Sequence, residues 1–406
     1  MGKELSPGLV DTLTERALGW CSERGFPLAK ARVISAETQG DSVTITLMVE
    51  RGPLVIPRDI SLSGTKASSG LRRCFSGVLG LPYSPQRTKE ALSIAEGFGF
   101  GEMEVVGFSL QEKGFVMVLR SGSSSSVTLL GSGAYDPSSG EAFGFLELSA
   151  PNIAGSGRGA RVSWERFSLL NQSISGSYRE PWIFGTPIWL ELGGGYAFAE
   201  SLYMSTEIYY KAAYRLSGET ELWAGQSWRE GRELPEGKNQ RGFFVIAGGT
   251  WSGLRPRIFP ERGFLLSADS RLSPSMQRVS WEGSLRIPFS FLTTGVSARG
   301  GLLQAQEAAL VSDLFQIGGP HPPRGYRPQR FFVEDYGVLS LDAGLIGPLS
   351  PFGFLDWCPE PHLPSPFSYG GGLRLRGKSL GLEAVYARSA SPGENGLFHI
   401  SVAGTF

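Results

Sequence analysis

The chain has 406 residues, enough for two or three domains or for one large β architecture with appendages. Its 38 lysines and arginines balance its 38 aspartates and glutamates, so it lacks the basic surface that drives nucleic-acid binding, and we expect no nucleic-acid partner. Glycine is abundant, at 56 residues, which favours a mainly β fold with many turns. The sequence has no run of about 18 consecutive apolar residues, so it predicts no transmembrane helix.

Cysteine and histidine usage gives no sign of a metal site or a disulfide framework. The three cysteines form no CxxC pair, and the three histidines are equally scattered. A Cys21–Cys74 bridge is compatible with the sequence but not implied by it, and free side chains are the simpler interpretation. We therefore expect no metal and no cofactor. The residues concerned are Cys21, Cys74, Cys358, His321, His362 and His399.

Residues 1–121 have a mixed α and β character. Residues 1–53 predict a helix followed by two strands, and residues 54–121 predict a strand, two helices and two strands. Compared with the second unit, the first lacks an opening strand and a first helix, which predicts that the chain begins inside a repeat. The first residues read as a capped amphipathic helix rather than as a signal peptide.

A serine-rich junction near residue 122 introduces a period of two that persists to the C-terminus. The segment from 202 to 217 shows this period most clearly, because its even positions are mostly apolar and its charged residues all stand at odd positions. Counting such segments gives about sixteen, an even number typical of closed antiparallel barrels. Segments near Asn152 and Trp223 are ambiguous, so the count could change by two.

Two folds can produce this alternation. In a soluble sandwich or barrel the apolar faces would point inward to a core. In a bilayer-spanning barrel they would point outward to lipid, with the charges lining a wet lumen. Many segments sustain the alternation for about nine residues or more, which favours the membrane barrel. Aromatic residues that fit interface girdles near segment ends are Tyr135, Tyr178, Trp182, Trp223, Trp251 and Phe406.

The C-terminal segment GLFHISVAGTF also alternates and ends in an aromatic residue. Such a final strand is the signature by which outer-membrane barrels are recognised for insertion, whereas an ordinary terminal strand would not need the final aromatic. The residues that share its apolar face are Phe398, Ile400, Val402, Gly404 and Phe406.

One segment interrupts the strand pattern. It reads IGGPHPPRGYRPQRFF, from Ile317 to Phe332, and holds four prolines and three arginines among glycines. Proline fixes φ and removes a backbone donor, so this segment is neither a strand nor a helix. The sequence therefore predicts a long, stiff, cationic loop between two strands.

Together these features resemble the outer-membrane POTRA-barrel superfamily (BamA-, TamA- and FhaC-like proteins, the bacterial surface antigen family). Residues 54–121 match a POTRA domain in element order and in the segments ISLSGT, GLPYS and KEALSIAEGFG. The barrel region carries LSAPNIAGSGRGARVSW, IFPERGFLLSAD and, most specifically, IGGPHPPRGYRPQ, which is similar to the family's Gly-Gly and Arg-Gly-Tyr loop motif. The matches cover essentially the whole chain in the family's order.

The resemblance implies a domain organisation and a site. Residues 1–53 would be a partial POTRA domain, residues 54–121 a POTRA domain, and residues 122–406 an outer-membrane β-barrel of about 16 strands, with the POTRA domains in the periplasm. In the family, the loop after the eleventh strand folds back into the lumen, and its arginine meets an acidic residue of an F-x-F-x-D strand motif. Here the loop motif is Gly318, Gly319, Arg324, Gly325 and Tyr326, and the strand motif is Phe352, Phe354 and Asp356.

Physical chemistry gives these residues clear roles. An unpaired arginine in a lumen would be costly, and a bidentate pair between Arg324 and Asp356 would fix the loop inside the barrel. Gly325 permits a tight turn, and Tyr326 can stack on the wall while its hydroxyl finds a polar partner. The prolines lower the entropy cost of holding the loop. The alternative is a solvated outer loop with an exposed arginine.

The resemblance implies an outer-membrane assembly factor that folds and inserts client β-barrel proteins. POTRA strand edges would accept an extended client, and the seam between the first and last strands would open sideways. Glycine weakens strand pairing, and both strands of this seam contain it, at Gly131, Gly133, Gly396 and Gly404. The expected partners are unfolded outer-membrane client proteins, outer-membrane lipids and accessory periplasmic or lipoprotein subunits.

Two other functions stay open. A polypeptide-secretion pore would pass its partner through the lumen with the loop as a plug, and a TamA-like translocation component is a related possibility. An enzyme is not expected, because the sequence offers no set of nucleophile, base and acid. The glycine cluster GSGRG at 155–159 lies in a strand and turn context rather than before a helix, so it does not predict a phosphate loop.

Overall fold

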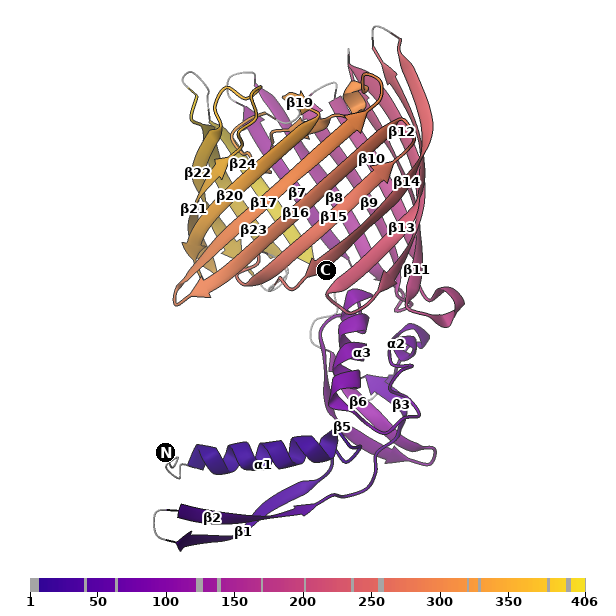
Figure 1. The fold of residues 1–406 in the computed structure, drawn as a ribbon, viewed down its shortest axis with the longest axis vertical. Coiled ribbons are helices and arrows are strands. Elements are labelled where there is room, and N and C mark those ends of the chain that lie inside the picture. Colours follow the sequence, from indigo (N-terminus) through magenta and orange to yellow (C-terminus); the bar gives the residue numbers. More distant parts are fainter. Residues whose placement is uncertain are drawn as a thin grey trace. The chain divides into compact units, whose positions relative to one another are not determined.

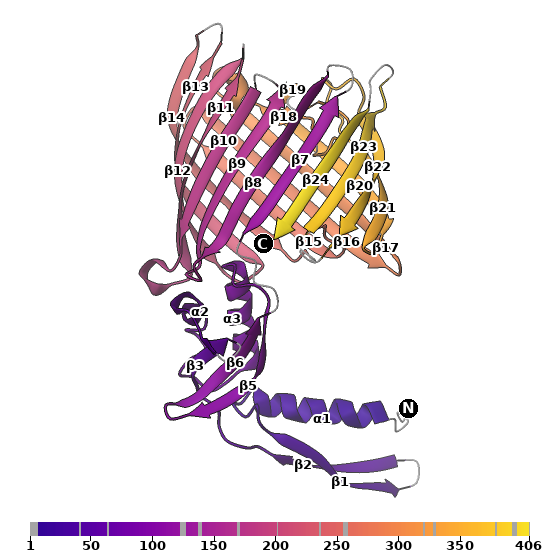
Figure 2. The same cartoon turned by 180° about the vertical axis from the view of Figure 1, so that it is seen from behind.

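The computed structural model describes residues 7–39, 42–62, 65–121, 127–136, 140–168, 171–200, 202–234, 237–254, 259–319, 321–327, 330–377, 380–391 and 396–405. The chain divides into two compact units, Met1–Ser124 and Ser125–Phe406. Among the described helices, none combines the length and apolar character that a membrane span needs. Figures 1 and 2 show both units from opposite sides.

The N-terminal unit has the element order predicted from the sequence, with one additional two-residue strand, β4, that was not predicted. A helix and a two-stranded antiparallel sheet come first, formed by α1 (Pro7–Ser22), β1 (Lys30–Gln39) and β2 (Ser42–Glu50). A four-stranded sheet of order β4-β3-β6-β5 follows, in which β3 and β6 run parallel. Its elements are β3 (Pro57–Leu62), β4 (Thr65–Lys66), α2 (Ser69–Cys74), α3 (Pro85–Gly97), β5 (Met103–Gln111) and β6 (Gly114–Ser121).

The two short helices of this second segment begin at serine caps. Ser68 Oγ accepts from Leu71 N at 3.2 Å, and Ser84 Oγ accepts from Arg87 N at 3.4 Å, with Pro85 in the first turn of α3. The helices and the sheet bury a common apolar core, which stabilises this part of the chain. Its buried residues include Ile60, Leu71, Phe75, Val78, Ala91, Ala95, Phe98, Met117 and Leu119.

The first segment buries much less. Trp20 of α1 and Ile34 of β1 are about half exposed, and the sheet beside them has only two strands. A two-stranded sheet leaves backbone donors and acceptors free along its edges. This segment therefore presents edges and apolar side chains that the rest of the described unit does not cover.

The second unit is a closed antiparallel barrel of 16 strands, as predicted. Each strand pairs with its neighbour along the chain, and the last strand, β24, closes the barrel by pairing with the first, β7 (Figures 1 and 2). The strands are β7 (Thr128–Asp136), β8 (Glu141–Ile153), β9 (Arg158–Ser168), β10 (Asn171–Glu180), β11 (Ile188–Ala199), β12 (Tyr203–Arg215), β13 (Thr220–Glu233), β14 (Asn239–Ser252), β15 (Gly263–Leu272), β16 (Met276–Phe289), β17 (Leu292–Ala305), β20 (Asp335–Leu345), β21 (Leu349–Trp357), β22 (Phe367–Arg376), β23 (Leu380–Ser389) and β24 (Leu397–Thr405).

The barrel wall separates apolar from charged side chains. On β12, Ile208 and Tyr210 are about half exposed on the outer face. The intervening residues of β12 face the lumen, where Lys211 pairs with Glu191 at 3.0 Å. Apolar residues outside and paired charges inside are the reverse of a soluble sandwich, so that interpretation of the alternation is wrong.

The predicted aromatic girdle is correct only in part. Tyr135, Tyr178 and Trp251 are exposed, but Trp182 is almost fully buried. Trp223 also faces inward, because it lies beside Lys211, whose Nζ is 5.6 Å from its ring centroid. The period-two pattern alone does not say whether a tryptophan points into the lumen or out of the barrel, which explains the error at Trp223. The sixth residue of the prediction, Phe406, lies outside the described residues.

A long segment, residues 306–334, connects β17 to β20 and is called here the long loop. It contains the single-turn helix η2 (Val311–Asp313) and a short hairpin of β18 (Phe315–Ile317) and β19 (Phe331–Val333). The prediction that Ile317–Phe332 contains no strand is therefore wrong at the two ends of the segment, where Ile317 belongs to β18 and Phe331 and Phe332 belong to β19.

Candidate functional site

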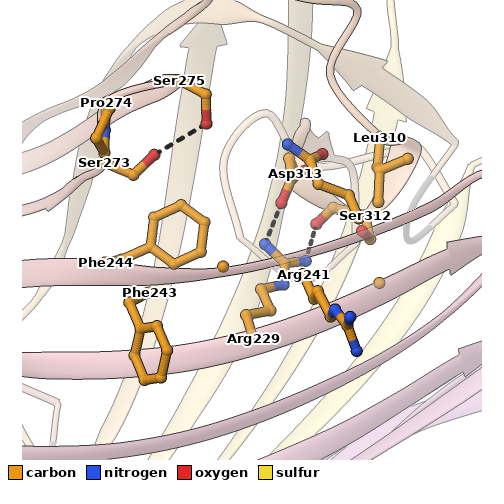
Figure 3. Close-up of a pocket in the computed structure, with 13 residues that line it drawn as sticks. Arg229, Arg241, Phe243, Phe244, Ser273, Pro274, Ser275, Leu310, Ser312 and Asp313 are labelled. Atoms are coloured by element: carbon orange, nitrogen blue, oxygen red, sulfur yellow. Dashed lines mark hydrogen bonds and ion pairs between the residues drawn. The ribbon is translucent and has the colours of Figure 1, made fainter.

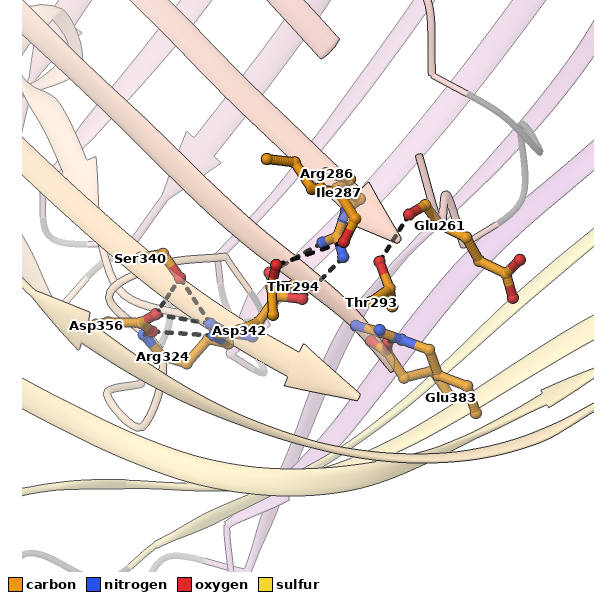
Figure 4. A network of polar contacts seen from close by, with 11 residues as sticks. Glu261, Arg286, Ile287, Thr293, Thr294, Arg324, Ser340, Asp342, Asp356 and Glu383 are labelled. Atoms are coloured by element: carbon orange, nitrogen blue, oxygen red, sulfur yellow. Dashed lines mark hydrogen bonds and ion pairs between the residues drawn. The ribbon is translucent and has the colours of Figure 1, made fainter. Parts of the chain in front are cut away.

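The arginine of the long loop meets the aspartate of the strand motif inside the barrel. Arg324 Nε donates to Asp356 Oδ2 at 2.9 Å and Arg324 Nη2 donates to Asp356 Oδ1 at 2.6 Å, which is the bidentate arrangement expected. The backbone N–H of Arg324 also donates to Asp356 Oδ2, at 2.9 Å. Asp356 is fully buried, and the Arg324 side chain is 13% exposed. The loop is thus held by a desolvated ion pair rather than by a surface contact (Figure 4).

Two wall residues complete this contact. Ser340 of β20 stands directly opposite Asp356 of β21, donates to Asp356 Oδ1 and accepts from Arg324 Nη2 at 2.9 Å. The Arg324 guanidinium lies flat over Phe354, with its Cζ 3.4 Å from the ring centroid. We call Arg324, Asp356, Ser340 and Phe354 the tip anchor. In the tip anchor, the edge of the Arg324 guanidinium contacts the Asp356 carboxylate and the Ser340 hydroxyl, and its face contacts the Phe354 ring.

The residues around Arg324 fix the loop against β23 and against the connection between β21 and β22. Gly325 has φ +88° and lies so close to β23 that a Cβ would stand 2.8 Å from the backbone carbon of Arg388, so only glycine fits. Tyr326 is buried, and its hydroxyl donates to the Ser365 carbonyl oxygen at 2.6 Å. Gly319 N donates to the Tyr326 carbonyl oxygen at 2.9 Å and closes the turn that begins at Gly318.

Tyr326 also covers the only cysteine of the barrel. It belongs to a buried cluster with Val338, Cys358 and Leu363. Cys358 lies just after β21, has no exposed surface and is a free thiol, as are Cys21 and Cys74 of the N-terminal unit. Burial raises the pKa of the Cys358 thiol to about 11.

The other aromatic residue of the strand motif holds a different arginine. Phe352 and Phe354 are both buried on the lumen side of β21. The Arg374 guanidinium stacks on Phe352, with its Cζ 3.7 Å from the ring centroid, while Arg374 Nε donates to Glu383 at 2.5 Å. The F-x-F-x-D motif therefore supports two stacked arginines, only one of which comes from the loop.

A second set of contacts holds the start of the long loop to β13. Arg229 donates from Nη1 to Asp313 Oδ1 and from Nη2 to the Ser312 carbonyl oxygen, while its Nε donates to Ser205 Oγ at 3.0 Å. Val311 N donates to Glu233 Oε1 at 2.8 Å. Figure 3 shows the Arg229 guanidinium directed at Asp313 and Ser312, beside a cavity of about 220 Å³ that these residues line. We call these contacts the base anchor.

Other charges in the lumen are paired between wall strands. Arg286 of β16 makes a bidentate contact with Asp342 of β20 at 2.8 and 3.1 Å. Arg271 of β15 pairs with Glu207 of β12 at 2.8 Å, and Arg376 of β22 pairs with Glu261 in the β14–β15 connection at 2.8 Å. These lumen arginines are therefore matched by carboxylates, and the long loop takes part in such pairs at both of its anchors.

The predicted terminal strand forms the seam of the barrel. β24 pairs with β7 from Phe398 opposite Tyr135 to Thr405 opposite Thr128. Phe398 and Ile400 are exposed on the outer face at 45% and 48%, with Val402 and Gly404 further along the same strand. Phe406 lies outside the described residues.

Glycines occur on both sides of this seam, with Gly131 and Gly133 in β7, Gly404 in β24 and Gly396 just before it. The seam has eight residue pairs, the same number as the β14–β15 ladder and more than the six of the β20–β21 ladder. The pair count therefore does not single the seam out as the weakest ladder.

The sequence motif identified the ion pair but not its surroundings. Ser340, the stacking role of Phe354 and the whole base anchor were missed. Period two places Ser340 and Arg229 on the lumen side, but it does not say which lumen-facing residue they meet. Among the described residues, no group of three or more histidine, cysteine, aspartate or glutamate side chains is arranged to hold a metal ion.

Comparison with solved structures places this fold among known barrels. BamA from Haemophilus ducreyi lacking POTRA domains 1–3 matches with a TM-score of 0.60 at 16% identity, covering 100% of this chain and 95% of that one. CdiB from Acinetobacter baumannii matches at 0.63 and 14% identity over 100% and 83% of the two chains, and CdiB from Escherichia coli at 0.65 and 14% over 98% and 85%. This chain therefore has the barrel fold of the BamA and CdiB structures. The barrel fold implied by the sequence resemblance is thereby confirmed, although no family model and no curated protein matches the chain.

Proposed function

We propose that this chain is an outer-membrane protein assembly factor that folds and inserts client β-barrel proteins. The observation that carries the proposal is a barrel of the BamA and CdiB fold whose arginine-bearing loop is anchored in the lumen through a buried ion pair with Asp356. An anchored loop leaves the lumen obstructed, so the route for a client is the seam rather than the channel. BamA, one of the matched proteins, has the same barrel fold.

The outer face of the barrel supports a position in the outer membrane. Side chains such as Leu192, Ile208, Leu222 and Val245 are about half exposed there, and no sheet edge is left open in the closed barrel. A closed sheet with an apolar outer face satisfies every backbone group without water, which is the condition for spanning a bilayer. Lipids of the outer membrane are accordingly partners in this proposal.

The N-terminal unit supports a role in receiving clients from the periplasm. Its strand–helix–helix–strand–strand order is that of a POTRA domain, and we assign residues 54–121 to one such domain and residues 1–53 to part of another. In the four-stranded sheet β5 is an edge strand, with Val106 and Leu110 exposed at 44% and 73%. An extended client could add to such an edge by β-augmentation. Accessory periplasmic or lipoprotein subunits could use the same edges.

The seam offers a direct test. Ser132 of β7 and Ser401 of β24 are opposite partners in the ladder, and their hydroxyl oxygens are 3.0 Å apart. Cysteines at these two positions are well placed for a disulfide that locks the seam. We expect the oxidised Ser132→Cys/Ser401→Cys variant to lose insertion of a client barrel into liposomes and to regain it on reduction.

A matched control lies on another part of the wall. Ser163 of β9 and Ser175 of β10 are also opposite partners, with hydroxyl oxygens 2.7 Å apart. A Ser163→Cys/Ser175→Cys lock joins two strands that need not separate, so insertion should proceed in both redox states. Full insertion activity with the Ser132–Ser401 lock closed would refute the seam mechanism.

The second candidate is a polypeptide-secretion pore, favoured by the likeness to the two CdiB barrels at TM-scores of 0.63 and 0.65. In that case the client would cross the lumen and the long loop would have to leave it. The seam lock would then leave transport intact. Gly231 and Ser312 offer the complementary lock, because a Cβ on Gly231 would lie 3.1 Å from Ser312 Oγ. Cysteines at these positions would tie the long loop to β13 and should stop a secretion pore.

A further inference from the structure

The long loop touches the barrel wall at two distant places. Its base anchor lies on β13 and its tip anchor on β20 and β21. In the closed barrel five strands separate β13 from β21 on the shorter way round, namely β14, β15, β16, β17 and β20. The loop therefore crosses the lumen from one part of the wall to another instead of resting on one side.

We propose that Arg229 is a second positioning residue for the long loop, and that it holds the loop in the lumen together with Arg324. This inference rests on the proposed role of the loop as an obstruction of the lumen. Arg229 acts through Asp313 and the Ser312 carbonyl group, so it fixes the point from which the loop starts its path to Asp356.

The chemistry of the base anchor makes it a strong contact. The side chains of Arg229 and Asp313 are only 11% and 6% exposed, so separating them would leave two poorly hydrated charges. Arg271, another lumen arginine, is paired with Glu207 at 2.8 Å rather than with Asp313. The base anchor therefore depends on the direct ion pair between Arg229 and Asp313.

The chain between the anchors is short and stiff, which couples them. Ten residues stand between Asp313 and Arg324, and three of them are prolines, Pro320, Pro322 and Pro323, whose rings restrict the backbone. β18 pairs with β19, so the two flanks of the arginine motif are tied together. The hairpin and the prolines limit the slack of the loop, so we expect a displacement at Asp313 to strain the contact between Arg324 and Asp356.

Cys358 is a native reporter of the loop position. It is fully buried in one cluster with Tyr326, so it becomes accessible only when this part of the loop moves away. Its raised pKa keeps it protonated and unreactive at neutral pH while it is buried. Cys21 and Cys74 lie in the other unit and serve as internal references within the same sample.

The experiment measures alkylation of Cys358 by a maleimide in the detergent-solubilised full chain, read by peptide mass spectrometry. Arg324→Gln is the positive reference, and we expect it to raise the rate about tenfold or more. Arg229→Gln should raise the rate by about three- to tenfold although it lies across the lumen, and the double variant should exceed either single variant. Arg229→Lys keeps the charge, so its Cys358 alkylation rate should lie between the rates of Arg229→Gln and the unmodified chain.

Arg271→Gln is the matched control, because it removes a lumen arginine whose partner is on the wall. It should change the Cys358 rate by less than about twofold. Equal rates in Arg229→Gln and the unmodified chain, or equal rates in Arg229→Gln and Arg271→Gln, would overturn the proposal. A variant whose barrel is unfolded is recognised by loss of the folded gel form, and the alkylation rate of Arg229→Lys is then used in its place. Because alkylation needs no client and no membrane, failure of the insertion assay with an intact labelling pattern would refute only the proposed function.

Discussion

Two arginine–aspartate pairs in the lumen have nearly the same chemistry but different places in the fold. Arg324–Asp356 joins the long loop to the wall, whereas Arg286–Asp342 joins two wall strands. Both are bidentate, and the side chains are 13% and 0% exposed in the first pair and 19% and 7% in the second. The first pair also receives Ser340 and the Arg324 backbone N–H, and Figure 4 shows both pairs in one view.

The difference lies in what else holds the partners together. Arg286 of β16 and Asp342 of β20 both stand opposite Gly295 of β17, which has no side chain, so the two charged groups meet above it. Their strands are fixed to β17 by ladders of 14 and 11 residue pairs. Removing this pair releases no element. Removing Arg324 weakens the hold on a segment that no barrel ladder fixes, because the two-stranded sheet of the long loop is separate from the barrel sheet. Equal chemistry should therefore have unequal consequences.

The largest effect is expected for Arg324→Gln. The substitution leaves the fully buried Asp356 without its cation, a change that typically costs about 3–5 kcal/mol when a buried pair is broken. The long loop should leave the lumen, so single-channel conductance in planar lipid bilayers should rise clearly above that of the unmodified chain. Conductance at the unmodified level would mean that the loop stays in place without the pair, and the contrast between the two pairs would fail.

Exchanging the two charges is not expected to repair the site. Asp356 accepts from Arg324 Nε and Nη2, from the Arg324 backbone N–H and from Ser340. An arginine at position 356 has donors only, so the backbone N–H and the hydroxyl would both lose their acceptor. The double variant Arg324→Glu/Asp356→Arg should therefore keep a high conductance, and full restoration of the low conductance would show that charge alone holds the loop.

Asp342→Asn tests the wall pair and should have a smaller effect of a different kind. Because Arg286 is partly hydrated, we expect a loss of about 1–3 kcal/mol of unfolding free energy rather than the full cost of a buried charge. The midpoint of the heat-induced gel-mobility shift measures this loss. Conductance should stay at the unmodified level, and an increase comparable to that of Arg324→Gln would show that the wall pair also controls the loop.

Sequence reasoning reached the barrel and the ion pair for physical reasons that did not extend further. Period two fixes which side chains face the lumen, as it did for β12, and the arginine and aspartate motifs are specific enough to pair Arg324 with Asp356. The period-two pattern does not fix the register of the strand pairs, which depends on the connections between strands. Ser340 meets Asp356 only because of the register set by the β20–β21 connection. Arg229 and Asp313 are 84 residues apart, and no local pattern links them.

Ser340→Ala should weaken the Arg324–Asp356 pair without breaking it, so that this pair differs less from the Arg286–Asp342 pair. The buried hydroxyl is both an acceptor for Arg324 and a donor to Asp356, so its loss removes two hydrogen bonds and leaves one guanidinium donor unmatched. We expect a cost of about 1–2 kcal/mol and a conductance between those of the unmodified chain and Arg324→Gln. Ser350→Ala, at another buried wall serine, is the control and should not change the conductance.

The smallest effect is expected where the same chemistry is exposed. In the N-terminal unit Arg120 of β6 pairs with Glu104 of β5 at 3.1 Å, but the two side chains are 66% and 63% exposed. Water and salt screen such a pair, and its net contribution is typically close to zero. Arg120→Ala should therefore leave the unfolding transition of this unit unchanged at any salt concentration, whereas the contact between Arg324 and Asp356 should resist salt because it is buried. A large salt-dependent loss in Arg120→Ala would show that burial is not what separates strong from weak pairs in this chain.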